Sequence, residues 1–341
     1  MTTFAENRTL ARRDFLVLAA VAAGGALPRA LRAGITQPVQ TTFDWTRIAP
    51  NVHVAFGSGG NSLLVTRAGE ALLVDTKVAA FGGVLRREAS ALGAAVRCVV
   101  NTHHHGDHIG GNDAFTNDVL TVAQTKAKDR VLRDVAASLA RLKGAPVDAY
   151  ATGLRRSGFD VRITPEGRAD IEAFIRAIES AKPEQFAPTV TFDTERELRA
   201  AGYAIHVHHV TPGHTDNDVI VHIPELNVLH AGDLLFNQHH TFVDVSAGAS
   251  TAGWDRCLAK ALELCNASTV VVAGHGPTTD RAGLQRQRDY FNRLRDVVAS
   301  AKREGKSRTD VVALKPAPFA DLAWPGLLAD TLGVLYDESS R

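Results

Sequence analysis

The stretch Thr102-His103-His104-His105-Gly106-Asp107-His108 follows the apolar segment 97–100, which has the pattern of a β-strand. Side chains at alternate positions of a strand end point the same way, so His103 and His105 can face one point. Gly106 permits a tight turn, after which Asp107 and His108 can face a second point nearby. Because imidazole and carboxylate groups are ligands that Zn²⁺ takes, this stretch predicts a metal centre. We expect His104 to point away from it.

Three further blocks place a His or an Asp directly after a glycine and downstream of an apolar strand pattern. They are Thr211-Pro212-Gly213-His214-Thr215, His230-Ala231-Gly232-Asp233 and Ala273-Gly274-His275-Gly276-Pro277. One such His is usually an ordinary loop residue, but four blocks of this kind in one chain favour a ligand set. We therefore predict that His214, Asp233 and His275 complete the centre.

These four blocks, in this order, resemble the metallo-β-lactamase superfamily over about residues 45–280. The resemblance implies an α/β fold, a four-layer αββα sandwich with the metals at one edge of the paired sheets. It implies two Zn²⁺ ions, with Fe or Mn as alternatives. His103, His105 and His214 would hold the first ion, Asp107, His108 and His275 the second, and Asp233 would bridge the two.

An Asp at position 233 makes the chain more similar to glyoxalase II and lactonases than to most antibiotic-degrading members of the superfamily. We therefore expect a hydrolase that uses a metal-bridging hydroxide to open a lactone, lactam, thioester or ester. Asp107 would also act catalytically, by orienting the hydroxide or passing on its proton. A β-lactamase, an iron persulfide dioxygenase, a phosphodiesterase and a metal-binding scaffold without activity are the alternatives.

Three other polar residues are candidates for substrate contact. His239 and His240 follow Gly-Asp-Leu-Leu-Phe by a few residues, near the expected mouth of the site. Ser246 lies in the loop-like stretch 244–250, where its hydroxyl could bind substrate or simply cap a helix.

The order of patterns along the chain predicts one catalytic domain, residues 34–315. A β-rich half precedes a mostly helical insertion at about 125–188, and a second β-rich half follows it. The insertion could cover the pocket or only pack on the surface. We expect the tail 316–341 to pack on or near the domain.

Residues 1–33 have the pattern of a twin-arginine-type signal peptide. Arg12 and Arg13 precede a short apolar run that is followed by small residues, and the run is too short to span a membrane. We therefore expect a periplasmic or secreted protein without a stable membrane anchor once the signal is removed. The alternative is a disordered tail with a chance arginine pair.

Composition limits the partners. The 341 residues contain 38 Lys and Arg against 37 Asp and Glu, a net charge of +1, with no basic stripe. This balance disfavours nucleic acid as a partner and leaves a small-molecule substrate as the expected one. No pattern in the sequence indicates an oligomeric state.

Overall fold

Two β-sheets packed face to face form the centre of the computed structural model, which describes residues 40–339. The first sheet has the order β1 (Asp44–Ala49), β2 (Val52–Phe56), β3 (Ser62–Arg67), β4 (Glu70–Val74), β5 (Ala95–Val100), β6 (Leu120–Gln124) and β7 (Val190–Phe192). The second has the order β12 (Val270–Val272), β11 (Val228–His230), β10 (Ile220–Ile223), β9 (Tyr203–His208) and β8 (Glu195–Ala200). Strands β4 to β7 and the β11–β12 pair are parallel, and the other neighbours are antiparallel.

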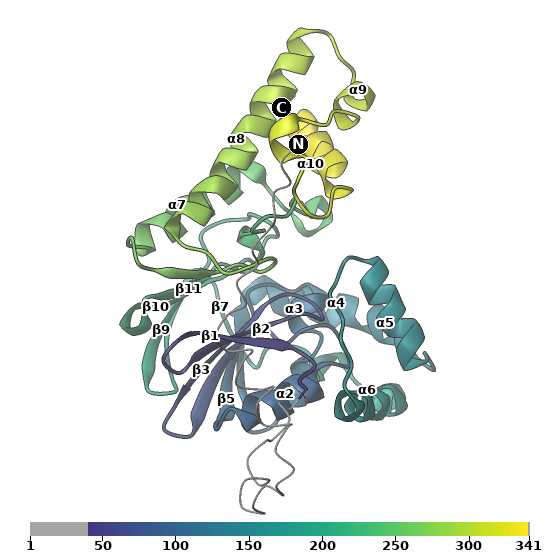
Figure 1. Cartoon of the computed structure of the whole chain (residues 1–341), viewed down its shortest axis with the longest axis vertical. Helices are drawn as coiled ribbons and strands as arrows, with labels where there is room; N and C mark the ends of the chain where they lie inside the picture. The colour runs from purple at the N-terminus through teal and green to yellow at the C-terminus, as the bar shows by residue number, and fades with distance from the viewer. Residues whose placement is uncertain (1–39, 340–341) are drawn as a thin grey trace, which may run out of the picture. The chain divides into compact units, whose positions relative to one another are not determined.

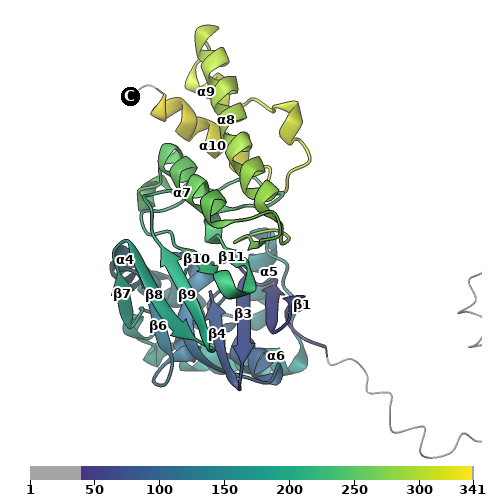
Figure 2. The same ribbon diagram turned by 90° about the vertical axis from the view of Figure 1, so that its left-hand side faces the viewer.

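Helices cover the outer faces of both sheets, as Figures 1 and 2 show. The α-helices of residues 40–339 are α2 (Gly82–Ala91), α3 (Gly106–Ile109), α4 (Thr125–Leu142), α5 (Val147–Arg156), α6 (Pro165–Ala177), α7 (Thr251–Leu264), α8 (Arg281–Arg303), α9 (Arg308–Val312) and α10 (Leu327–Glu338). The first sheet packs against α2, α5 and α6, and the second against α7, α8 and α10. The predicted four-layer αββα sandwich is confirmed.

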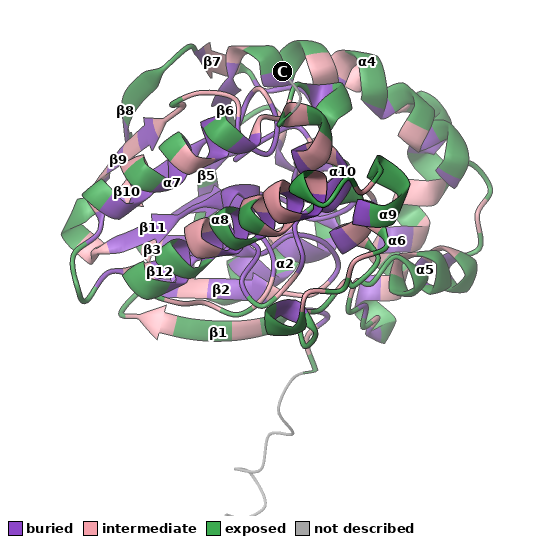
Figure 3. Ribbon diagram, turned by 90° about the horizontal axis from the view of Figure 1, so that it is seen from above, coloured by how far each residue is buried: buried purple, intermediate pink, exposed green. Residues whose placement is uncertain are grey.

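Apolar side chains at alternate positions of the strands fill the space between the sheets. Along β9, Tyr203, Ile205 and Val207 are buried and alternate with partly exposed residues. They share one cluster with Val52 and Val54 of β2, in the other sheet. Seen from above, buried residues are concentrated in the strands that lie between the helices (Figure 3). The period of two along each strand thus sets which face joins the core.

The segment 125–188 is helical, as its pattern predicts, and belongs to the same compact unit as both sheets. It contains one helix that the sequence patterns do not predict, α5. Only Val147 and Ala151 of α5 are buried, so its apolar stripe is weak. Strands β1 and β8 are also unpredicted, because both are edge strands with mostly polar, exposed residues.

The C-terminal segment also packs on this unit. Helix α10 contacts α8 and α9, and its Leu332 and Leu335 join the cluster that covers the second sheet. Among the helices of residues 40–339, none is long and apolar enough to cross a lipid bilayer. The predicted signal peptide, residues 1–33, lies outside the described residues.

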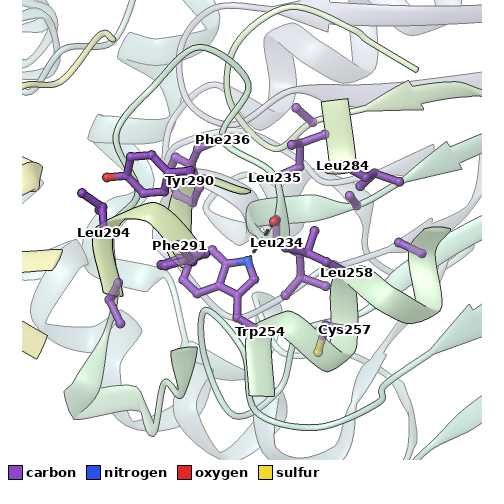
Figure 4. Close-up of a cluster of buried hydrophobic side chains, with 14 of the residues drawn as sticks. Leu234, Leu235, Phe236, Trp254, Cys257, Leu258, Leu284, Tyr290, Phe291 and Leu294 are labelled. Carbon is purple, nitrogen blue, oxygen red and sulfur yellow. Dashed lines mark hydrogen bonds between the residues drawn. The ribbon is translucent and has the colours of Figure 1, made fainter. Parts of the chain in front are cut away.

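Trp254 of α7 is the largest fully buried side chain of the described residues. It lies at the centre of the hydrophobic cluster that covers the second sheet (Figure 4). Its Nε1–H donates to the carbonyl oxygen of Leu234 at 2.8 Å, and its ring packs against Phe291 of α8 at 4.9 Å. The indole therefore joins α7 and α8 to the turn that contains Leu234.

We expect Trp254→Ala to lower the free energy of unfolding by about 3–5 kcal/mol, because it leaves a large cavity and an unpaired carbonyl. Urea unfolding followed by circular dichroism measures the change. Val245→Ala is the control: its side chain is 58% exposed, so a change within about 0.5 kcal/mol is expected. Equal stabilities of the two variants would contradict the central position of Trp254.

Candidate metal centre

Four connections bring the predicted ligands to one edge of the paired sheets. The segment 103–108 follows β5, His214 follows β9, Asp233 follows β11 and His275 follows β12. Each ligand therefore lies beyond the C-terminal end of a strand. The topology of the two sheets thus places residues that are distant in sequence beside one another.

His103, His105, His214 and Asp233 form a first group, whose ligand atoms all lie within 4.8 Å of one another. His214 Nε2 lies 2.9 Å from His105 Nδ1 and 3.5 Å from Asp233 Oδ2. His103 Nε2 lies 3.9 Å from the same carboxylate oxygen. The group offers three imidazole nitrogens and one carboxylate oxygen, a donor set that suits a transition-metal ion such as Zn²⁺.

Asp107, His108 and His275 form a second group, again within 4.8 Å. His275 Nε2 lies 3.2 Å from Asp107 Oδ2 and 3.4 Å from His108 Nε2. Asp233 also reaches this group, because its Oδ2 lies 3.3 Å from His275 Nε2 and its Oδ1 lies 3.1 Å from His108 Nε2. One carboxylate therefore stands between two sets of ligands.

One buried nitrogen atom shows whether these residues suit metal binding. His103 Nε2 has no hydrogen-bond partner among the described residues, although the side chain is only 1% exposed. A buried polar atom without a partner costs about 1–3 kcal/mol, so such atoms are rare. A metal ion between the imidazoles would supply the missing partner. The donor set and this atom together fit metal binding.

Hydrogen bonds on the outer side of each ring fix which nitrogen faces the centre. His214 donates from Nδ1 to the carbonyl oxygen of Phe242 at 2.8 Å, and His108 donates from Nδ1 to Asp75 Oδ2 at 2.7 Å. In both rings Nε2 is left for the metal. His105 is turned the other way: its Nε2 lies 2.9 Å from Asp244 Oδ2, and its Nδ1 faces His214.

Hydrogen bonds from the Asn61 side chain hold the loop of His275 next to the first sheet. The side-chain nitrogen of Asn61 donates to the carbonyl oxygens of Ala273 and Gly276, at 2.9 and 2.8 Å. A Cβ at Gly274 would collide with Asp233 Oδ1. Only glycine therefore lets this loop approach the carboxylate so closely.

Burial and neighbouring charges set the protonation of the imidazoles. Burial lowers the pKa of His214 to about 3, and burial together with the charge of His108 lowers the pKa of His103 well below its ordinary value. Burial also acts to lower the pKa of His275, but the carboxylates of Asp233 and Asp107 outweigh it and raise that pKa to about 9. His103 and His214 are thus held as neutral imidazoles, the form that binds metal ions.

A cavity of about 800 Å³ opens beside the centre. Its lining includes four of the predicted ligands, His105, Asp107, Asp233 and His275. Aromatic and apolar side chains supply most of the remaining wall: Phe159, Phe236, Phe242, Trp324 and Leu327. The sequence patterns do not single out these wall residues, because they come from loops whose positions depend on the tertiary fold.

The three predicted substrate contacts lie in different places. His239 packs edge-on against Trp324, with centroids 4.8 Å apart, and lines a neighbouring cavity of about 340 Å³. His240 is 2% exposed and its Nδ1 lies 3.0 Å from the hydroxyl of Tyr290. Ser246 is exposed and donates to Asp244 Oδ1. None of the three is part of the described lining of the 800 Å³ cavity, so substrate contact by them stays a prediction.

The sequence also gives little sign of the residues that support the ligands. Asp75 directly follows an apolar strand, and this position is the one sequence signal that could have identified it. In the structure Asp75 also accepts hydrogen bonds from the backbone N–H and the hydroxyl of Thr102. Asp244 has no such signal. His104, expected to point away from the metals, has its backbone N and its Nδ1 close to the side chain of Asn217.

The two sheets define an αββα sandwich, and the clustered His and Asp residues form a candidate metal centre at one edge of it. Residues 55–275, more than half of the chain, match the family model described as the metallo-β-lactamase superfamily. The chain belongs to this superfamily, whose members are typically hydrolases.

Individual proteins are similar to the chain at low identity. A linear primary-alkylsulfatase from a Pseudomonas species is 25% identical over 147 residues, which are 41% of this chain and 26% of the alkylsulfatase. The match thus spans about a quarter of that relative. A metallo-β-lactamase from Pontibacter korlensis has a TM-score of 0.51 and 21% identity, over 71% of this chain and 95% of its own. The DIM-1 metallo-β-lactamase has a TM-score of 0.51 and 19% identity, over 73% of this chain and 96% of its own. These two structures show a likeness of fold.

We expect Asp244→Asn to weaken zinc binding about 10- to 100-fold, because the carboxylate that orients the His105 ring is lost. Competition with a chromogenic chelator measures the dissociation constant. Ser246→Ala is the matched control, since it removes a hydroxyl bonded to Asp244 but keeps the carboxylate. Unchanged affinity in Asp244→Asn would show that His105 needs no such support.

Proposed function

We propose that the protein is a dinuclear zinc hydrolase that opens a cyclic or activated acyl bond, in a lactone, lactam, thioester or ester. The position of Asp233 carries this proposal. Its two carboxylate oxygens lie within 3.1–3.5 Å of His108, His214 and His275, which belong to both ligand groups. A carboxylate placed between two ligand groups, beside a cavity, would suit a two-metal hydrolytic site.

Each of the two ligand groups would hold one ion. His103, His105 and His214 would hold one Zn²⁺, Asp107, His108 and His275 the other, and Asp233 both. Zinc supplies Lewis acidity when bound, which lowers the pKa of water and polarises a carbonyl oxygen. Fe or Mn in place of zinc would use the same nitrogen and oxygen donors.

Asp107 is the residue of this set best placed to move a proton. Its side chain is 19% exposed and lines the cavity, whereas the side chain of Asp233 is 4% exposed. Asp107 Oδ2 can therefore accept a proton from the attacking water and return it to the leaving group. The carboxylate needs to be ionised for this, and burial acts against that state. In the metal-free chain the charges and hydrogen bonds of His108 and His275 outweigh burial and keep the pKa of Asp107 well below the ordinary value. With these two imidazoles neutral on a metal ion, the ion would supply the positive charge instead.

Sulfate-ester hydrolysis is a second candidate, because the curated relative is an alkylsulfatase. The largely apolar cavity wall would suit the hydrocarbon part of such a substrate. A β-lactamase is a narrower form of the main proposal. A mononuclear iron persulfide dioxygenase would use part of the same ligand set, and the metal content distinguishes it.

The remaining elements of the proposal concern location and partners. The twin-arginine-type pattern of residues 1–33 supports a periplasmic or secreted protein, without a stable membrane anchor after cleavage. The near-neutral charge supports a small-molecule substrate and disfavours nucleic acid.

Metal analysis and turnover of the full chain test the proposal together. We expect about two zinc ions per chain and hydrolysis of at least one member of a panel containing a chromogenic cephalosporin, a lactone, a thioester and an alkyl sulfate. The double variant His103→Ala/His105→Ala should bind about one ion and fall to the background rate, because two of the three imidazoles of the first group are gone.

The double variant His206→Ala/His222→Ala is the matched control. It also removes two imidazoles, from paired positions on β9 and β10, and should retain both zinc ions and full activity. Undiminished zinc and turnover after loss of His103 and His105 would overturn the ligand assignment. One iron per chain and no turnover of the panel would favour the dioxygenase.

A further inference from the structure

Aromatic rings flank the metal centre on two sides of the 800 Å³ cavity. Phe242 lies beside the first ligand group, with ring centroids 5.8 Å from His105 and 5.9 Å from His214. Trp324 and Phe159 lie beside the second group, 4.8 and 6.1 Å from the ring of His275. A molecule that occupies this cavity beside the centre therefore lies close to these rings.

Phe242 is also unusually exposed for so large an apolar side chain, at 40% of its surface. Its ring contacts the two ligands from the cavity side, so the exposed part faces the same space as Trp324 and Phe159. An apolar group placed there would bury surface against the rings on both sides, which favours its binding. The walls thus select an apolar body next to the scissile bond.

Arg156 is the one charged side chain of the cavity lining that belongs to neither ligand group. Its neighbour Arg155 is occupied, since Nε and one terminal nitrogen donate to the carbonyl oxygen of Val161. Within residues 40–339, by contrast, no carboxylate or carbonyl group pairs with the guanidinium of Arg156. The cavity therefore presents an arginine that is available to a ligand.

Contacts between distant segments fix the backbone that follows Arg156, whose own side chain is exposed. Arg156 lies in the last turn of α5, and the next residues, Ser157 to Phe159, also line the wall. Trp324 Nε1–H donates to the carbonyl oxygen of Gly158 at 3.3 Å, and the backbone of Ser58 donates to that of Asp160 at 2.7 Å. The end of α5 is thus fixed between the first sheet and the C-terminal segment.

The geometry points to a substrate class: an apolar molecule that carries a carboxylate remote from the bond that is cleaved. The apolar body would lie between Phe242 and the Trp324–Phe159 pair, and the carboxylate would form hydrogen bonds with Arg156. Arginine binds carboxylates through two parallel N–H donors, which gives both affinity and direction. This assignment rests on the proposed hydrolase, and it gives the helical segment 125–188 a role in substrate binding.

Calorimetric binding to the full chain tests the assignment without turnover. The probes are 4-phenylbutyrate and its neutral amide, each measured with zinc present and after removal of metal by a chelator. We expect the carboxylate to bind more tightly than the amide in both states. Arg156→Gln should weaken the carboxylate about 10- to 100-fold and change the amide less than about twofold, as for the loss of a charge-assisted hydrogen bond.

Two further variants separate charge from position. Arg156→Lys should restore part of the preference for the carboxylate, because the positive charge is kept. Arg176→Gln, on α6, makes the same change in net charge at a side chain that is 69% exposed and absent from the cavity lining, and should leave both affinities unchanged.

Equal binding of the two probes, binding of neither, or an Arg156→Gln variant that keeps the wild-type preference would overturn the assignment. The assignment would also be overturned if the carboxylate binds more tightly than the amide only while zinc is present. The zinc ions, and not Arg156, would in that case bind the carboxylate. If the hydrolase proposal alone is wrong, the preference that depends on Arg156 remains while no panel substrate is turned over.

Discussion

The buried carboxylate of Asp233 is the group on which the rest of this structure depends. A negative charge inside a protein costs several kcal/mol unless positive charge or hydrogen bonds compensate it. Here the compensation comes from His108 and His275, and it requires three loops to meet within a few ångströms. The close glycine approaches, the strand order and the orienting hydrogen bonds all serve to bring these loops together.

The same contacts join the centre to the hydrophobic core. Trp254 holds the carbonyl oxygen of Leu234, the residue after Asp233, and its ring lies 5.5 Å from that of His214. Stability and site geometry are therefore coupled, because a shift of α7 would move two ligands at once. A rigid core beneath the ligands keeps their positions fixed before any ion arrives, which lowers the cost of binding it.

The sequence predicts the layers, and the clustering of the seven candidate ligands, well because both depend on local patterns. Alternating apolar residues mark the inner strands, and the Gly–His and Gly–Asp blocks mark the loops after them. The polar edge strands and α5 escape prediction, since they bury little apolar surface. Asp244, Trp324 and Arg156 escape it for another reason. No pattern of their own marks these three residues, and only the tertiary fold brings Asp244 to His105 and brings Trp324 and Arg156 to the cavity.

Asn61 has a consequence for how the chain folds. Its side chain bonds to Ala273 and Gly276, more than 200 positions further along, so an early hairpin is completed by one of the last strands. Contacts between such distant segments form slowly, because a long loop must close first. During synthesis, the first group can gather once α7 and its Trp254 have emerged, but the second must wait for His275. A chain released before that point would have half of a centre, and the two halves of the metal site would therefore mature in sequence.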